Sequence, residues 1–262
     1  MGALRRSSSN HGSSAGEPEY RRCTGDVILV HYSMTNTHGE RFLYLLFHKP
    51  YGVLSQFSSP NHPDTISPHR TLKDFGPFPS GVYPVGRLDA ESEGLLILTD
   101  DKEVSCRLTE PRFSHPRTYL IQVERIPDEK ALNVLRRGGM RFGNRPAKPA
   151  SVRILEDDPV VSPRPVPIRR RESVPTCWLE IIVAEGMNRQ VRRMTAAIGH
   201  PTLRLIRIAV GPVHLANLRP GEWRRLATGE ISQLRKSLGL APEALHRAAS
   251  SLSGLRSWRR NL

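Results

Sequence analysis

Short apolar segments separated by turn residues run through the middle of the chain. Six of them have the length and the β-branched, aromatic or leucine content of strands. These segments are 42–47, 94–99, 119–124, 151–156, 178–184 and 203–210. Their number and spacing predict that a sheet forms the frame of the protein.

Helical periodicity appears in three other segments, 128–137, 187–198 and about 230–238. The first stops at a Gly-Gly pair and the second at Gly-His-Pro, both of which end helices. In the second segment the large apolar residues recur at spacings of four, three and four and form a buried stripe; they are Met187, Val191, Met194 and Ile198. Strands and helices together predict an α+β protein.

The two ends of the chain differ from this middle part. Residues 1–40 are rich in Ser and poor in large apolar side chains, so we expect a tail and lead-in. The first residues are also Arg-rich and acid-poor, as in a transit peptide, but no amphipathic periodicity supports that alternative. We expect a catalytic domain at 41–235, with a Pro-rich connection near 157–175 that is either an exposed loop or a link between two lobes, and a basic tail at 236–262.

Charge narrows the choice of partner. The 262 residues contain 39 Lys and Arg and 25 Asp and Glu, a net charge of +14. Between residues 160 and 210 the basic residues are all Arg, which grips phosphate with a planar fork and stacks on bases. This composition favours a nucleic acid over an anionic membrane surface, and a solvated basic face is the plainer alternative.

Membrane insertion and metal binding are not expected. The longest apolar run, 42–47, is far shorter than the roughly 20 residues that cross a bilayer. The three cysteines, Cys23, Cys106 and Cys177, form no Cys-x-x-Cys pair, so we expect no thiolate metal site and a reducing, cytoplasmic location. The acidic pairs at 100–101 and 157–158 suggest a two-metal nuclease only weakly, because adjacent acids point apart.

An Arg-x-Asp pair, Arg87 and Asp89, stands in a polar loop just before the buried segment 94–99. The guanidinium can hold the carboxylate ionised, and the following strand can fix both groups at a cleft. On spacing alone, an ordinary surface ion pair is the alternative.

Several motifs that follow one another along the chain favour a functional role for this Arg-x-Asp pair over an ordinary surface ion pair. They are Phe-His-Lys-Pro-Tyr-Gly-Val at 47–53, Gly-Arg-Leu-Asp at 86–89 followed by Ser-Glu-Gly-Leu-Leu at 92–96, Arg-Thr-Tyr at 117–119, Glu-Gly-Met-Asn-Arg-Gln-Val-Arg-Arg-Met at 185–194 and Pro-Thr-Leu-Arg-Leu-Ile-Arg at 201–207. On the basis of these motifs, the chain resembles the RNA pseudouridine synthases over residues 43 to 226. Within that family it is most similar to the type E enzymes, which act on large-subunit ribosomal RNA.

The resemblance implies roles for the residues around Asp89. Asp89 would be the catalytic carboxylate, forming an adduct with the ribose or the base or taking a sugar proton. Arg87 would fill the gap in the RNA that the extruded nucleotide leaves. Tyr119 would stack on the flipped uracil, although a strand Tyr is more often half-buried packing.

Further roles follow for the helix 187–198 and the strand after it. Arg192 would be the buried partner of the catalytic carboxylate, with Arg189 and Arg193 left for phosphates. Leu205 would line the uracil pocket, although a strand Leu is usually core. Arg117 stands where relatives commonly have Lys, which puts a specific role for that position in doubt.

The resemblance also implies the architecture and the partner: a mixed, mainly antiparallel sheet in two lobes, flanking helices and an RNA-binding cleft. We expect a cofactor-free monomer that binds ribosomal RNA and lacks the N-terminal S4 module of many relatives, since residues 1–40 read as a tail. A non-catalytic RNA-binding or ribosome-assembly factor on the same fold is the rival. The intact set of Asp89, Tyr119 and Arg192 opposes it, because a scaffold has no physical need for all three.

Overall fold

The structure is a computed structural model that describes residues 42–58, 70–168 and 171–241. The expected tail 1–40 and most of the expected C-terminal tail lie outside these residues. The strands are β1 (Tyr44–Lys49), β2 (Tyr83–Pro84), β3 (Glu93–Thr99), β4 (Arg117–Glu124), β5 (Arg141–Phe142), β6 (Arg145–Pro146), β7 (Ser151–Ile154), β8 (Thr176–Val183), β9 (Thr202–Val210), β10 (Val213–His214) and β11 (Trp223–Arg225). The α-helices are α1 (Lys102–Thr109), α2 (Glu129–Arg137), α3 (Gln190–Ala197) and α4 (Thr228–Ser237), and two short 3-10 helices span Leu72–Phe75 and Pro111–Phe113.

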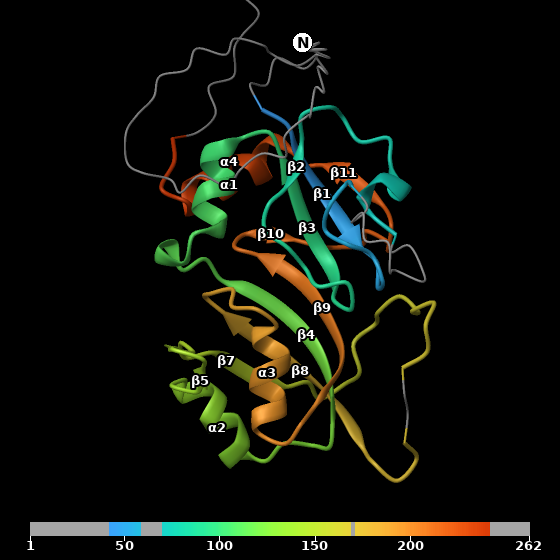
Figure 1. The fold of residues 1–262 in the computed structure, drawn as a ribbon, viewed down its shortest axis with the longest axis vertical. Coiled ribbons are helices and arrows are strands. Elements are labelled where there is room, and N and C mark those ends of the chain that lie inside the picture. The colour runs from blue at the N-terminus through green and yellow to red at the C-terminus, as the bar shows by residue number, and fades with distance from the viewer. Residues whose placement is uncertain (1–41, 59–69, 169–170, 242–262) are drawn as a thin grey trace, which may run out of the picture. The chain divides into compact units, whose positions relative to one another are not determined.

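Most strands join one sheet in the order β11-β1-β3-β9-β4-β8-β7 (Figure 1). Strand β2 pairs with β3 and β10 pairs with β9, while β5 and β6 form a separate hairpin. Among the described strands of this sheet, β3 and β9 run parallel and the other pairs are antiparallel. The prediction of a mixed, mainly antiparallel sheet is confirmed.

The parallel pair β3–β9 joins two halves of the sheet. We call β11, β1, β2 and β3 the β1 half, and β9, β10, β4, β8 and β7 the β4 half. The junction has two register positions, Glu93 opposite Ile206 and Gly94 opposite Arg207. Gly94 has φ +105°, and a Cβ there would lie 2.2 Å from the carbonyl oxygen of Arg207. Glycine therefore permits the close approach of the two main chains.

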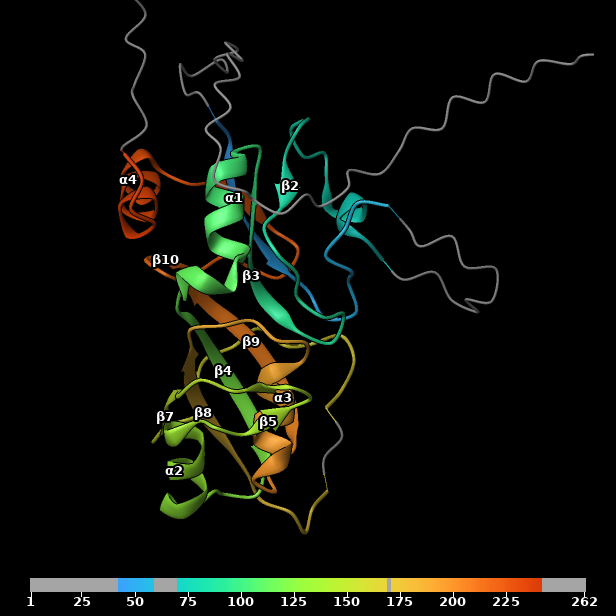
Figure 2. The same cartoon turned by 60° about the vertical axis from the view of Figure 1, so that its left-hand side comes forward.

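Helices cover each half and supply part of its core (Figures 1 and 2). In the β4 half, apolar side chains of α2 and α3 pack on strands β4, β8 and β9; those of the helices are Leu132, Leu135, Val191 and Met194. In the β1 half, apolar side chains of α1 and α4 pack on β1 and β3; those of the helices are Val104, Leu108, Ile231 and Leu234. Burial of these faces provides most of the stability of helices this short.

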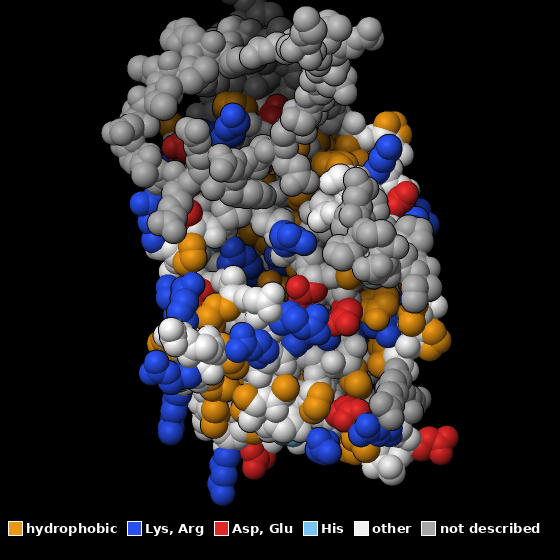
Figure 3. All heavy atoms as spheres, in the orientation of Figure 1, with side chains coloured by type: hydrophobic (Ala, Val, Ile, Leu, Met, Phe, Trp, Pro, Cys, Tyr) orange, Lys and Arg blue, Asp and Glu red, His pale blue; other side chains and the backbone are white. Residues whose placement is uncertain are grey.

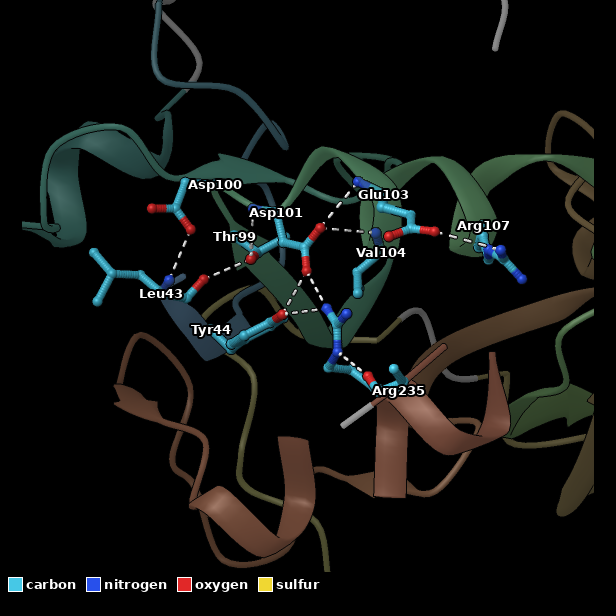
Figure 4. A network of polar contacts seen from close by, with 10 residues as sticks. Leu43, Tyr44, Thr99, Asp100, Asp101, Glu103, Val104, Arg107 and Arg235 are labelled. Atoms are coloured by element: carbon cyan, nitrogen blue, oxygen red, sulfur yellow. Dashed lines mark hydrogen bonds and ion pairs between the residues drawn. The ribbon is translucent and has the colours of Figure 1, made fainter. Parts of the chain in front are cut away.

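Helix α1, which the sequence analysis did not predict, explains the acidic pair at 100–101. The Asp101 carboxylate accepts hydrogen bonds from the Glu103 and Val104 amides and so caps the helix. It also contacts the Tyr44 hydroxyl and the Arg235 guanidinium, each at 2.5 Å (Figure 4). This network ties α1, β1 and α4 together, which is a structural use of the acid. The described residues contain no cluster of metal-ligating side chains.

The Pro-rich segment connects β7 to β8, which are antiparallel neighbours, so it is a long loop within one half. Its middle contacts the rest of the fold. The Ser162 carbonyl accepts a hydrogen bond from Arg204 on β9, and the Arg164 guanidinium lies 4.1 Å from the centre of the Tyr51 ring. None of the described helices has the length and apolar character that a membrane span requires.

Candidate active site

Asp89 lies in the loop between β2 and β3, as the sequence predicts, with about a third of its side chain exposed. The loop turns back at Ser92, whose amide donates to the Asp89 carbonyl at 3.0 Å. Leu88 beside it is buried and bonds through both its amide and its carbonyl to the Ser55 hydroxyl, at 3.0 and 2.9 Å. These contacts hold the carboxylate in a fixed place.

Lys49, at the end of β1, reinforces this loop from inside the protein. Its fully buried ammonium group donates to the carbonyls of Pro50, Val53 and Ala90, at 2.9, 2.6 and 3.3 Å. Burial lowers the pKa of Lys49 to about 7, against the opposing effect of two carboxylates, Glu93 and then Asp89. Lys49 therefore connects the Lys-Pro-Tyr-Gly turn to the residue that follows Asp89.

A cavity of about 580 Å³ opens beside Asp89. Five of the seven residues expected to act line it, namely Asp89, Tyr119, Arg87, Leu205 and Arg189. It lies where the loop after β2, the β4–β9 pair and the segment before α3 meet. A volume of this size is within the range of small-ligand sites.

One wall of the cavity is the β4–β9 pair. Arg117 and Tyr119 alternate on β4, and Leu205 and Arg207 alternate on β9, so that each pair points to the same face. Tyr119 and Leu205 are both largely buried and give this wall an aromatic and aliphatic part. The arrangement fits a flat ring held against Tyr119 and Leu205 with polar atoms directed at the guanidiniums.

Arg189 lies nearest to the Asp89 carboxylate among the expected arginines, at 4.0 Å, and it pairs with Glu91 at 2.8 Å. It has φ +47°, a left-handed conformation, directly before the first residue of α3. The helix therefore begins three residues later than predicted. This turn points Arg189 to the cavity and not along the helix surface.

Arg192 does not pair with Asp89 in this structure, contrary to the role that the resemblance implies. Its guanidinium donates to the main-chain carbonyl of Glu91 at 2.8 Å, and more weakly to that of Thr202 at 3.4 Å. Its Nε is buried without a hydrogen-bond partner. Burial lowers the pKa of Arg192. Arg192 thus supports the loop two residues after Asp89.

The remaining expected residues lie at the surface. Arg87 is exposed at the rim of the cavity. Arg193 is exposed on α3, and its guanidinium lies 4.4 Å from the centre of the Phe142 ring, outside the cavity. Figure 3 shows Lys and Arg side chains gathered across the middle of this face, with acidic side chains among them. This face of the protein therefore carries both charges, with basic side chains prominent.

Several residues of the site were not singled out by the sequence analysis. Ser55 and Lys49 hold the Asp89 loop, and Glu185 is a buried carboxylate in the cavity wall that accepts from Gln190 at 2.6 Å. Arg207 also lines the cavity. Three of these, Lys49, Glu185 and Arg207, lie inside the quoted motifs, and that position was the signal that could have identified them.

Comparison with known proteins agrees with this geometry. The family pattern described as RNA pseudouridylate synthase matches residues 43–197, which include Asp89, Tyr119 and all of α3. The chain therefore belongs to the RNA pseudouridine synthases, and the protein is an isomerase.

Two relatives and one solved structure show more specifically which pseudouridine synthases the chain is similar to. The chain is 52% identical over 182 residues to ribosomal large subunit pseudouridine synthase E of Xanthomonas campestris pv. campestris, covering 70% of this chain and 94% of that protein. It is 45% identical over 183 residues to the enzyme of the same name from Vibrio vulnificus, covering 70% and 74%. A crystal structure of a pseudouridylate synthase aligns with a TM-score of 0.60 at 29% identity over 74% of each chain.

Proposed function

We propose that the protein converts a uridine of large-subunit ribosomal RNA to pseudouridine. The names of its relatives support the substrate, and the cavity beside Asp89 supports the reaction. Pseudouridine formation detaches uracil from its ribose, turns it and rejoins it through carbon 5. An oriented carboxylate beside a pocket for a flat base meets the needs of that chemistry, which transfers no electrons to a cofactor.

In this proposal, each of the residues that line the cavity has its own role. Asp89 acts on the nucleotide, Tyr119 stacks on the uracil, and Leu205 closes the apolar side of the pocket. Arg87, exposed at the rim, fills the space in the RNA that the flipped nucleotide leaves. Arg189 supplies a positive charge between Asp89, Glu91 and the approaching phosphates.

The cellular setting follows from this substrate. An enzyme that modifies ribosomal RNA works where ribosomes are assembled, which supports the expected cytoplasmic location. We also propose that the protein acts as a monomer; light scattering coupled to gel filtration tests this.

Mapping of pseudouridines in ribosomal RNA tests the function. Cells that lack the protein should lose one or more sites in large-subunit RNA, and the wild-type gene should restore them. Asp89→Asn is nearly isosteric, so it should fold and bind RNA without restoring any site. Asp157→Asn, an exposed acid in the Pro-rich loop, is the matched control and should restore them. If deletion leaves every site modified, the rival role as a non-catalytic assembly factor is favoured.

A further inference from the structure

Two arginines in the cavity wall have no acidic partner among the described residues. Arg207 is 5% exposed, and its Nε donates to the Leu95 carbonyl at 2.7 Å. Arg117 donates to the carbonyls of Leu108 and His115, at 2.7 and 3.5 Å. Buried charges are normally paired, so two unpaired guanidiniums in one cavity wall need an explanation.

The two guanidiniums are held close together. Arg207 stands opposite Tyr119 in the β4–β9 register, and Arg117 lies two residues before Tyr119 on the same face. Both also line a small second cavity of about 10 Å³ whose other walls are apolar, formed by Val85, Ile97, Leu108 and Val210. Burial lowers the pKa of Arg117, and the like charge of Arg207 adds to this shift against the effect of Tyr119. A ligand with negative charge would relieve this repulsion.

A glycine lies against each of the two arginines, and the close approach of the main chains requires the one at position 94. Gly94 lets β3 approach the main chain of Arg207 itself. Gly186 faces Arg117, and a Cβ there would lie 3.7 Å from its terminal nitrogen. The terminal nitrogens of Arg207 hydrogen-bond to no described residue, and the side chain lines the main cavity. Arg207 is therefore fixed at its Nε and has its terminal nitrogens available, whereas the terminal nitrogens of Arg117 each hold one main-chain carbonyl and keep a second N–H for a ligand.

We propose that Arg117 and Arg207 bind the carbonyl oxygens of the flipped uracil and stabilise the negative charge on that base while it is detached from the ribose. The proposal rests on the isomerase function above. When the bond between C1′ and N1 breaks, its electron pair stays on N1 and spreads to O2 and O4. When C5 then bonds to C1′, the C5 proton is lost and N1 gains a proton, so the overall reaction is an isomerisation.

Depth in the cavity favours the base over a phosphate as the ligand. A flipped nucleotide puts its base farthest from the RNA backbone. Arg207 is almost fully buried beside Tyr119 and Leu205, which would hold the ring, whereas the Arg189 side chain is 43% exposed. In such a buried site, oriented donors act on charge much more strongly than they do in water.

Single-turnover kinetics on a large-subunit RNA transcript test the assignment. Arg207→Gln and Arg117→Gln should each slow pseudouridine formation at saturating RNA by roughly 100-fold, the usual effect of losing one donor to a developing anion. The dissociation constant for RNA should change little. Arg153→Gln, an exposed arginine on β7, is the matched control and should leave both quantities unchanged. Thermal unfolding shows which of Arg207→Gln and Arg117→Gln are folded. One folded variant is sufficient for the test.

A modified substrate separates charge stabilisation from mere support of the pocket. In a synthetic RNA with 5-fluorouridine at the mapped target, fluorine withdraws electrons and stabilises the detached base. The rate difference between wild type and Arg207→Gln, measured as conversion of 5-fluorouridine, should then shrink several-fold. An unchanged difference overturns the proposal, as does a loss confined to RNA affinity, which would indicate phosphate contacts. A wild-type enzyme that is inactive on the unmodified uridine transcript would instead contradict the proposed function.

Discussion

The guanidinium of Arg204 on β9 and the carboxylate of Glu93 on β3 form two parallel hydrogen bonds, at 2.9 and 2.8 Å. Both side chains are buried, with 6% and 2% of their surface exposed. The pair spans the parallel junction between the two halves of the sheet, and Arg204 also donates to the Ser162 carbonyl of the Pro-rich loop. Because Glu93 follows Asp89 by four residues, this ion pair anchors the end of the loop that carries Asp89.

Glu93→Gln should therefore destabilise the protein strongly. Removing one member leaves a buried, uncompensated charge, and the expected loss in the free energy of unfolding is about 3–5 kcal/mol. Urea denaturation measures it. Glu180→Gln removes the acid from an exposed pair with Arg153 and should cost less than about 1 kcal/mol. The double variant Glu93→Leu with Arg204→Met should recover much of the lost stability. If Glu93→Gln and Glu180→Gln lowered the free energy of unfolding equally, this account would be wrong.

Replacement of the three arginines at α3 should have different effects. Arg189→Ala removes the cation nearest to Asp89, so turnover at saturating RNA should fall by about tenfold or more, a change of roughly 1.4 kcal/mol in the barrier. Arg193→Ala should weaken RNA binding and lower its salt dependence by about one unit with turnover unchanged. Filter binding at several salt concentrations and single-turnover rates measure the two effects.

Arg192→Ala provides the contrast. It removes the hydrogen bond to the Glu91 carbonyl and should slow turnover less than Arg189→Ala does. If Arg192→Ala stops turnover while Arg189→Ala changes only affinity, Asp89 exchanges its arginine partner when RNA binds.

Lys49 should make stability depend on pH. Its pKa is about 7 in the folded protein and 10.5 as a free side chain, so the unfolded chain binds more protons between these values. The free energy of unfolding should then rise as the pH increases from 7 to 10.5, by at most about 1.4 kcal/mol per unit from this group. The charges that act on it are Glu93, Asp89 and Arg207.

Denaturation of Lys49→Met across this pH range provides the test. The variant should show a shallower rise than wild type, and Lys102→Met, which replaces an exposed lysine, should keep the wild-type slope. Equal slopes for all three proteins would mean that the three carbonyls hold Lys49 as the ammonium ion throughout.

Chelation should leave the enzyme active. Isomerisation of uridine requires neither an electron carrier nor a Lewis acid when a carboxylate and oriented donors act on the base. Pseudouridine formation on a short, stably folded RNA should therefore survive exhaustive EDTA treatment. Loss of activity that Mg²⁺ restores on this RNA would contradict the prediction, and circular dichroism of the RNA shows whether its fold has changed.

The sequence predicted the sheet and the Asp89 loop because both depend on local patterns. Apolar alternation marks β4 and β8, and a polar loop before a buried strand marks Asp89. Position within α3 was harder to predict, because the left-handed turn at Arg189 shifts the start of the helix and with it the directions of Arg189 and Arg192. Periodicity assumes a continuous helix and cannot detect such a turn.

Contacts between residues far apart in the sequence explain the other differences between the predictions and the structure. Asp101 caps α1, but its partners Tyr44 and Arg235 are 57 and 134 residues away, so the sequence around it resembles a plain acidic turn. Arg207 looks like one more basic residue until the β4–β9 register places it opposite Tyr119, next to an irregularity in that pairing. No local pattern encodes such neighbours.

The strand order also sets when each half of the sheet can be completed during synthesis on the ribosome. All strands of the β4 half come from one continuous stretch, 117–214, so this half can acquire its full set of neighbours while the C-terminal end is still being made. The β1 half combines the early strands β1 to β3 with β11 and α4, which emerge last. Contiguous units fold first as a chain emerges. The apolar strands β1 and β3 are made early but are not packed against β11 and α4 until the end of synthesis. They are therefore the part of the nascent chain most in need of a chaperone.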